Sequence, residues 1–226
     1  MYKYILMDND GTLMDFEKAK RESVKMSWNM LGMEKEFTEE IQQTYDKIND
    51  KWWLMLEKGE VTRDELETGR FADFFEKVGV VADPQKMMEL YEENISHMKF
   101  ILDGATETMK KLSEKYEIYI ITNGFSNIQH GRLDDCEFTP YFRKMYVSGD
   151  IGLVKPDKAY FDYVMKDIGD MDKSAYLVVG DSLSSDILGA KNAGMDCAWV
   201  HPKGKVTDLP IKYHIESVKE LTEILL

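Results

Sequence analysis

The chain has 226 residues, 43% of them hydrophobic and 31% charged, and a formal net charge of −13. This composition is that of an ordinary globular protein and excludes a fibrous or disordered chain. Acidic residues outnumber basic ones both in residues 15–99 and in the remainder, so no surface for a nucleic acid polymer is expected. The two cysteines, Cys136 and Cys197, form no disulfide framework.

The first residues predict a buried strand. Residues 2–7 are mostly aromatic and aliphatic and run into the polar turn that begins at Asp8. The apolar run is too short for a secretory signal, and no run in the chain approaches the roughly 18–20 apolar residues that cross a bilayer. We therefore expect a cytoplasmic protein that is not embedded in a membrane.

Residues 15–99 carry helix signals and no convincing strand. Helices are expected to begin near residues 17, 38, 62 and 84. Thr62 and Glu65 match a capping box, in which a helix-opening threonine and a glutamate three residues later satisfy each other's backbone N–H groups. Asp83 before Pro84 is typical of an N-cap followed by proline at the first helical position. This stretch is predicted to be an all-helical unit.

From Gly104 onward, helix and strand signals alternate. Strands are expected over residues 117–121, 144–148, 175–179 and 197–200. Helices are expected over 105–115, from about 125 to 134, and over 158–168, 184–192 and 217–226. Such alternation predicts an α/β fold, a parallel sheet with helices on both faces. The first strand belongs with this part, so the helical unit is an insertion.

Polar side chains suited to a single reaction follow three of the predicted strands. Because ligands bind at the carboxyl ends of parallel strands, we expect these side chains to converge at one edge of the sheet. They are Asp8 and Asp10 after the first strand, Thr122 and Asn123 after the second, Asp181 and Asp186 after the strand at 175–179, and Lys155 in a turn between them.

The chemistry of this set favours phosphoryl transfer. Several carboxylates together are costly without a cation, and oxygen ligands without His or Cys favour Mg²⁺ over zinc. Beside a bound metal, the Asp8 carboxylate can attack phosphorus. Lys155 and Thr122, with the amides around Asn123, can hold the phosphoryl oxygens. Asp10 can protonate the leaving oxygen and later activate water.

Four segments resemble the motifs of the haloacid dehalogenase (HAD) superfamily. DNDGTL at 8–13 resembles its first motif, TNG at 122–124 its second, KP at 155–156 its third and GDSLSSD at 180–186 its fourth. They occur in the order of the superfamily, and the resemblance spans about residues 3–200. It implies a Rossmann-like α/β core of residues 1–14 and 100–226, with a helical cap inserted at residues 15–99.

The resemblance also implies a role for each residue. Asp8 would be the nucleophile and a Mg²⁺ ligand, and Asp10 the general acid/base that also gives the metal its main-chain carbonyl. The phosphate would be held by Thr122, Asn123 and Lys155. Asp181 would bind Mg²⁺, and Asp186 would orient that ligand or a metal-bound water. Asn9 stands where the superfamily frequently has an apolar residue, which leaves this mechanism intact.

The inserted segment looks like the cap of bacterial pyrimidine 5′-nucleotidases of this superfamily. The similarity lies in Trp53, GEVT at 59–62, Leu66 and GRF at 69–71, and Phe125 extends it. It implies hydrolysis of nucleoside 5′-monophosphates, with Trp53 and Arg70 at the substrate. An aromatic ring can stack on a base, but Trp52 and Trp53 lie about 100° apart on a helix and cannot both do so. Arg70 could equally be an exposed helix residue.

Other members of the superfamily remain as alternatives. A sugar-phosphate phosphatase would use the same core residues, and a phosphosugar mutase would require activation by a bisphosphate. Asp10 argues against a dehalogenase, which has no leaving oxygen to protonate. A non-catalytic binding protein of this fold is disfavoured because Asp8, Asp10, Lys155 and Asp181 are all present. The expected partner is a small phosphate ester, and the oligomeric state is left open.

Overall fold

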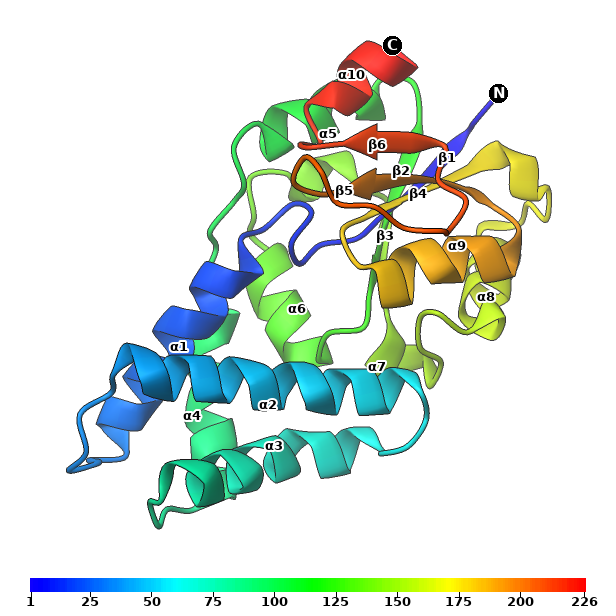
Figure 1. Cartoon of the computed structure of the whole chain (residues 1–226). Coiled ribbons are helices and arrows are strands. Elements are labelled where there is room, and N and C mark those ends of the chain that lie inside the picture. The colour runs from blue at the N-terminus through cyan, green and yellow to red at the C-terminus, as the bar shows by residue number, and fades with distance from the viewer.

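The computed structural model describes residues 1–226 and contains one six-stranded parallel sheet (Figure 1). The strands lie in the order β3-β2-β1-β4-β5-β6. Their bounds are β1 Tyr4–Met7, β2 Glu117–Thr122, β3 Lys144–Val147, β4 Tyr176–Gly180, β5 Asp196–Val200 and β6 Tyr213–Ile215. The chain adds strands on one side of β1 and then crosses to the other side, which creates a switch point between β1 and β4.

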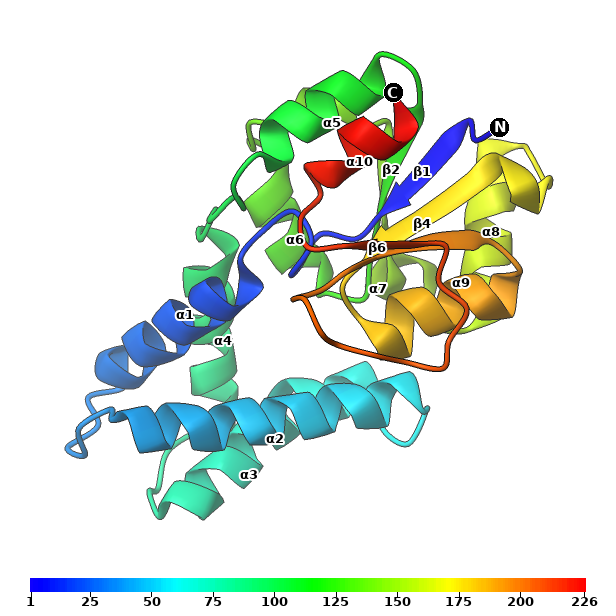
Figure 2. The ribbon, with the colours of Figure 1, turned by 45° about the horizontal axis from the view of Figure 1, so that its top comes forward.

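Helices cover both faces of the sheet (Figures 1 and 2). On one face lie α5 (Ala105–Ser113) and α10 (Glu220–Leu225), and on the other α8 (Lys158–Ile168) and α9 (Leu188–Ala193). Neighbouring residues of β1 pack on opposite faces of the sheet, because side chains alternate along a strand. Ile5 and Met7 pack in the cluster that includes Leu221, and Leu6 packs in the cluster that includes Phe161. The expected α/β fold is confirmed.

The inserted segment forms four helices that lie beyond one end of the sheet (Figures 1 and 2). They are α1 (Phe16–Met30), α2 (Glu39–Glu57), α3 (Arg63–Val78) and α4 (Pro84–Ser96). A separate apolar cluster holds them together, with Trp28 and Phe74 fully buried in it. The capping box at Thr62 and the N-cap at Asp83 are both confirmed. No helix of the chain combines the length and apolar character needed to span a bilayer.

The structure adds elements that the sequence analysis missed. The edge strand β6 has three residues and lies next to β5, and α7 (Ser148–Ile151) is a single turn. Such short elements carry no periodic pattern to detect. The helix expected at 184–192 begins as a π-helical turn, Leu183–Ile187, before α9. The helix expected from about 125 to 134 is confirmed as α6 (Ser126–Leu133), and a short helical turn that was not expected, Thr139–Tyr141, follows it before β3.

The register of the sheet brings the polar strand ends together. Met7 of β1 lies opposite Ile120 of β2 and Val179 of β4. Asp8, the next residue after Met7, therefore leaves the sheet at the same edge as Thr122 and Asp181. This edge faces the inserted helices (Figure 2).

Trp52 and Trp53 of α2 point to different environments, as their spacing predicts. The Trp52 indole packs over Gly69 of α3 and donates a hydrogen bond to Asp73, at 2.9 Å. A Cβ atom on Gly69 would lie 2.3 Å from the Trp52 ring. Trp53 instead lies 5.4 Å from the ring of Phe125, which follows β2 in the α/β part. Trp52 is thus a packing residue of the helical insertion.

We expect Gly69→Ala to destabilise the protein by about 1–3 kcal/mol, because the Trp52 ring has to move away from α3. The free energy of unfolding from urea denaturation measures the effect. In a Trp52→Ala background the same substitution should be neutral or stabilise by up to about 1 kcal/mol, because alanine favours a helix more than glycine does. Equal destabilisation in both backgrounds would contradict the packing of Trp52 on Gly69.

Candidate active site

A buried lysine lies between two buried aspartates at the carboxyl edge of the sheet. The Nζ atom of Lys155 donates hydrogen bonds to Asp8 and to Asp186, each at 2.7 Å, and to the Ile121 carbonyl at 3.1 Å. All three N–H donors of the ammonium are therefore engaged. The Lys155, Asp8 and Asp186 residues are at most 6% exposed. Buried charges require such partners.

The crowding of carboxylates shifts the proton affinities of these groups. Burial, together with Asp186 and Asp181, raises the pKa of Asp8 well above its ordinary value, although Lys155 opposes the shift. Burial alone would lower the pKa of Lys155, but Asp186 and Asp8 raise it above its ordinary value. The lysine therefore remains an ammonium, while the carboxylates have an unmet demand for positive charge.

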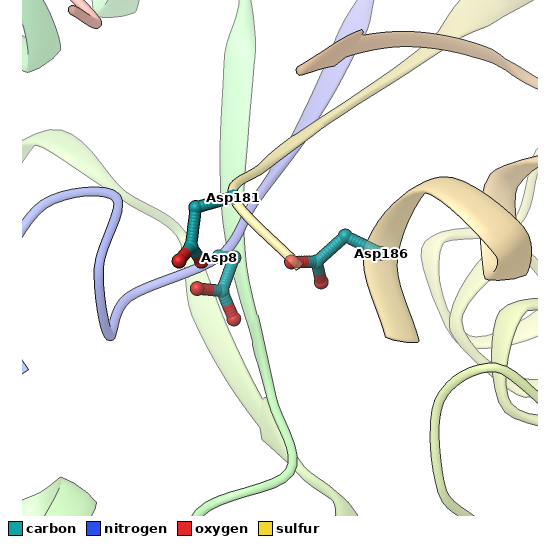
Figure 3. A group of neighbouring side chains, drawn as sticks. All are labelled: Asp8, Asp181 and Asp186. Carbon is teal, nitrogen blue, oxygen red and sulfur yellow. The ribbon is translucent and has the colours of Figure 1, made fainter. Parts of the chain in front are cut away.

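Asp181 completes an acidic group in front of β1 and β4. Carboxylate oxygens of Asp8, Asp181 and Asp186 all lie within 4.8 Å of one another. Figure 3 shows the carboxyl groups of Asp8 and Asp181 next to each other, with Asp186 approaching from the helix side. Asp181 reaches this position over Gly11, whose φ is +84° and where a Cβ atom would lie 2.4 Å from the Asp181 carboxylate. Burial and Asp186 raise the pKa of Asp181 to about 7.

This acidic group fits a hard divalent cation. Its donors are all oxygens, it contains no His or Cys, and one lysine does not balance three carboxylates. A cation there would remove the repulsion that raises the pKa of Asp8 and of Asp181.

The loop after β2 joins the other half of the site. The Asn123 side chain donates to the Lys155 carbonyl at 2.8 Å and accepts from the Lys155 amide at 2.9 Å. The side-chain amide of Asn123 therefore holds the Lys155 segment in place. The main-chain N–H of Asn123 has no hydrogen-bond acceptor in the protein and is available to a ligand. The Thr122 hydroxyl accepts a hydrogen bond from the Gly124 amide, at 3.0 Å, and Thr122 lines the cleft.

Asp10 has surroundings that differ from those of Asp8. Gln129 and Arg132, both on α6, donate hydrogen bonds to the two oxygens of its carboxylate. The Asn9 side chain, fully buried, donates to Gln129 at 2.8 Å. Gln129 and Arg132 were not predicted as site residues, because a glutamine and an arginine three residues apart on a helix match no motif. Asn9 was noted from the sequence only because it stands where an apolar residue is frequent.

A cleft of about 240 Å³ lies between these groups and the inserted helices. Its far wall includes Asn49, Trp53, Arg70 and Tyr91. Arg70 is 1% exposed, so the interpretation as an exposed helix residue is wrong. Its guanidinium donates to Asn49 at 2.9 Å and lies against the rings of Phe71, Tyr91 and Phe125. The helix α3 is amphipathic, and only its packing shows that position 70 faces inward.

One arginine of the insertion bonds directly to the α/β part. Arg63, at the start of α3, donates to the main-chain carbonyl of Asn123 at 2.8 Å and to the Ser148 hydroxyl. The insertion is therefore held against the loop after β2, and this contact closes one side of the cleft.

The structure thus brings together Asp8, Asp10, Thr122, Asn123, Lys155, Asp181 and Asp186, together with Trp53 and Arg70 from the insertion. These are the site residues that the sequence predicted.

Known proteins are similar to this chain over nearly its whole length. A family described as haloacid dehalogenase-like hydrolase matches residues 5–200. YfnB of Bacillus subtilis, described as a HAD-hydrolase, is 33% identical over 99% of this chain and 95% of its own. A crystal structure of YfnB bound to magnesium superposes with a TM-score of 0.91 and covers 99% of this chain and 98% of its own.

Two other relatives are named as enzymes with a specific activity. The pyrimidine 5′-nucleotidase YjjG of Escherichia coli is 31% identical over 99% of this chain and 98% of its own. The pyrimidine 5′-nucleotidase PynA of Streptococcus pneumoniae is 30% identical over 99% of this chain and 95% of its own. The similarity in both cases includes the inserted helices as well as the core.

We expect Asp181→Asn to raise the melting temperature of the metal-free protein at pH 8. Since the pKa of Asp181 is raised from 3.8 to about 7 on folding, its contribution to stability is full below pH 3.8 and is lost as the pH rises through 7. The Asp181 carboxylate lies among the groups of the site, but the residue as a whole remains accessible to solvent, which weakens the repulsion. Removing the charge should therefore restore only up to about 1 kcal/mol, or about 2–4 °C. Thermal unfolding in EDTA measures the change.

If the acidic group binds Mg²⁺, the same variant should gain less stability from added Mg²⁺ than the natural chain does, because it lacks one of the three carboxylates that could hold the cation. Asp208→Asn, which removes an exposed carboxylate far along the chain, is the matched control and should shift the melting temperature by no more than about 1 °C. A lower melting temperature for Asp181→Asn in EDTA at pH 8 would show that repulsion does not govern this site.

Proposed function

Starting from the fact that the chain belongs to the haloacid dehalogenase-like hydrolase family, we propose that it is a Mg²⁺-dependent phosphatase that hydrolyses pyrimidine nucleoside 5′-monophosphates. The resemblance stated from the motifs is confirmed, and so is the expectation of an enzyme. That the chain is a phosphoric monoester hydrolase follows from its family and its named relatives. The observation that carries the finer proposal is the placing of Asp8, Lys155 and Asp10 at one end of a cleft whose other end is lined by Trp53 and Arg70.

In the proposed first step, an Asp8 oxygen attacks phosphorus and the bond from phosphorus to the nucleoside oxygen breaks. Asp10 gives its proton to that oxygen, so the nucleoside leaves as a neutral alcohol. In the second step a water oxygen attacks the phosphorus of the aspartyl-phosphate while its proton passes to Asp10, and the bond from phosphorus to the Asp8 oxygen breaks. Inorganic phosphate is released, and the Asp8 carboxylate and the protonated Asp10 are regenerated. Covalent catalysis of this kind divides one difficult displacement into two easier ones.

The oxygens of the transferring group need donors opposite the nucleophile. We assign this role to Lys155, the Thr122 hydroxyl and the Asn123 main-chain N–H. The side chain of Asn123 acts indirectly, since it holds the main chain of Lys155 through two hydrogen bonds. A bound phosphate would compete with Asp8 and Asp186 for the Lys155 ammonium.

The acidic group suits Mg²⁺, which when bound would neutralise charge on the phosphoryl oxygens. Asp8, Asp181 and the Asp10 main-chain carbonyl are the ligands we assign. Asp186 already accepts hydrogen bonds from Lys155 and from the Ser182 amide, at 2.7 and 3.1 Å. We therefore assign Asp186 to orienting these neighbours or a metal-bound water.

The far end of the cleft has the features of a base-binding site. Trp53 and Phe125 present aromatic surface on which a base can stack. Buried donors without a protein partner lie beside them, namely the Arg70 Nε atom and the Tyr91 hydroxyl. Burial raises the pKa of Tyr91 well above its ordinary value, so the hydroxyl keeps its proton. The carbonyl oxygens of a pyrimidine are acceptors that such donors require.

Within this proposal, residues 15–99 act as a cap that closes the cleft and excludes water. The bond from Arg63 to the Asn123 carbonyl holds the insertion on the core. The structure of YfnB bound to magnesium was described as revealing interdomain movement, which is consistent with a cap of this kind. We further infer a cytoplasmic enzyme that acts on small molecules.

The proposal is tested by phosphate release from a panel of nucleoside monophosphates and sugar phosphates. We expect kcat/KM for pyrimidine monophosphates to exceed that for purine or sugar phosphates on the order of 10-fold or more. EDTA should remove the activity and Mg²⁺ should restore it. Phosphate release from sugar phosphates alone would support the proposed phosphatase mechanism but contradict the nucleotidase assignment. Activity that survives EDTA would contradict the proposed dependence on Mg²⁺.

Trp53→Ala sharpens this experiment. Loss of stacking should raise KM for uridine 5′-monophosphate about 10-fold or more, since base stacking on an aromatic side chain contributes about 1–3 kcal/mol. Trp52→Phe is the matched control, because Trp52 packs on Gly69 outside the lining of the cleft. An unchanged KM for Trp53→Ala would remove Trp53 from the substrate site.

We expect Asp8→Asn to lower kcat on the order of 10⁴-fold or more while leaving the fold intact, because an amide cannot attack phosphorus as a carboxylate does. The measurements are steady-state phosphate release and the circular dichroism spectrum. Asp162→Asn, which removes an exposed aspartate paired with Lys158, serves as control and should retain activity. Activity near that of the natural chain in Asp8→Asn would rule out Asp8 as the nucleophile.

A further inference from the structure

Both oxygens of the Asp10 carboxylate are held by side chains of α6. Gln129 Nε2 donates to Asp10 Oδ2 at 2.6 Å, and Arg132 Nη1 donates to Oδ1. Gln129 is 1% exposed and Arg132 is fully buried. Because the two residues are three positions apart, they lie on one face of the helix and reach the same carboxylate.

Gln129 is itself oriented from behind. Asn9 Nδ2 donates to Gln129 Oε1 at 2.8 Å, so the glutamine oxygen faces Asn9 and its NH₂ group faces Asp10. Asn9, which stands where the first motif frequently has an apolar residue, thus has a hydrogen-bond partner in Gln129. We refer to Asn9, Gln129 and Arg132 together as the Asp10 clamp.

The loop after β2 leaves room for this arrangement. A Cβ atom at Gly124 would lie 2.3 Å from Gln129 Nε2 and 2.9 Å from its Cγ and Cδ atoms. Any side chain at position 124 would therefore displace Gln129 from Asp10. The packing of Gln129 therefore explains why position 124 of the second motif is a glycine in this chain.

Arg132 is anchored on its other side as well. Its Nε atom donates to the Met98 carbonyl at 3.1 Å, in the segment that leads from α4 back to the core. Its guanidinium lies 5.7 Å from the ring of Phe16, at the start of α1. A guanidinium fixed at several points cannot follow a rotation of the Asp10 side chain, so the carboxylate is held in place.

We propose that Gln129 and Arg132, with Asn9 behind Gln129, are positioning residues that hold the Asp10 carboxyl group in the orientation needed for proton transfer to the leaving oxygen. This inference rests on the proposed function of Asp10 as general acid/base. Proton transfer requires the two heavy atoms to approach to about 2.6–3.2 Å, and an aspartate free to rotate about its side-chain bonds spends less time there. Oδ1 accepts hydrogen bonds from Arg132 and, at 3.4 Å, from Asn9, whereas Oδ2 accepts only the hydrogen bond from Gln129 and keeps a second lone pair for the proton.

A positioning role is distinguishable from a purely structural one by the leaving group. A nucleoside alkoxide is a poor leaving group and needs the proton, whereas 4-nitrophenolate leaves readily without it. The parameter kcat/KM reports the reaction up to departure of the alcohol, so it isolates the step in which Asp10 acts as acid.

We expect Gln129→Met to lower kcat/KM for uridine 5′-monophosphate on the order of 10- to 100-fold, a fraction of the effect of a general acid. With 4-nitrophenyl phosphate the loss should stay below about 3-fold, because little proton transfer is needed. KM for both substrates should change little. Asn127→Met is the matched control: it alters an exposed amide on the same helix that bonds to Glu92, and should leave both substrates unaffected.

Two further variants separate the possible outcomes. Arg132→Lys keeps a cation beside Asp10 and should show the same selective loss of kcat/KM for uridine 5′-monophosphate. We choose lysine because a larger change at this buried residue could prevent folding. Asp10→Asn should show the selective loss in its strongest form. If Asp10→Asn loses both substrates equally, the acid role within the proposed function is overturned, and this inference with it. If Asp10→Asn is selective but Gln129→Met and Arg132→Lys are not, only the clamp is overturned.

Discussion

The site depends on one buried ammonium. Lys155 bonds to Asp8 at the end of β1, to the Ile121 carbonyl in β2 and to Asp186 in the turn after β4. Taking a charged group out of water costs several kcal/mol unless opposite charge and hydrogen bonds compensate it. Each of the three charged groups therefore requires the other two. Because they come from distant parts of the sequence, the ammonium also joins those segments in space.

The single lysine does not neutralise the carboxylates around it, and the remaining negative charge suits the site to bind a cation. Three carboxylates surround one lysine, so burial and mutual repulsion raise the pKa of Asp8 and of Asp181. A protein selected for stability alone would not keep this arrangement, since removing one carboxylate would relieve it. The demand for further positive charge is the physical basis for assigning a divalent cation to the site.

Asp8 and Asp10 are two residues apart yet have separate surroundings. Asp8 lies against Lys155 at the sheet, whereas Asp10 lies beyond the strand and is held by α6. Carboxylates placed in different environments can serve different functions, one as nucleophile and one as acid and base. The cleft continues toward the insertion, where the Arg70 Nε atom and the Tyr91 hydroxyl are buried donors without a protein partner.

The sequence by itself determined the fold class, the helical insertion between the first and second strands, and the set of charged residues at the carboxyl edge. These rest on local signals: apolar strands, capping residues and short motifs at strand ends. It did not determine that Arg70 is buried or that Gln129 and Arg132 meet Asp10, and it missed β6. A polar residue on a short helix reads the same in sequence whether it faces solvent or a carboxylate. Only the crossing of α6 behind the end of β1 decides that Gln129 and Arg132 meet Asp10, because these contacts join residues more than 100 positions apart. Only the packing of α3 against α2 and α4 decides that Arg70 meets Asn49 and Tyr91, which lie on those neighbouring helices.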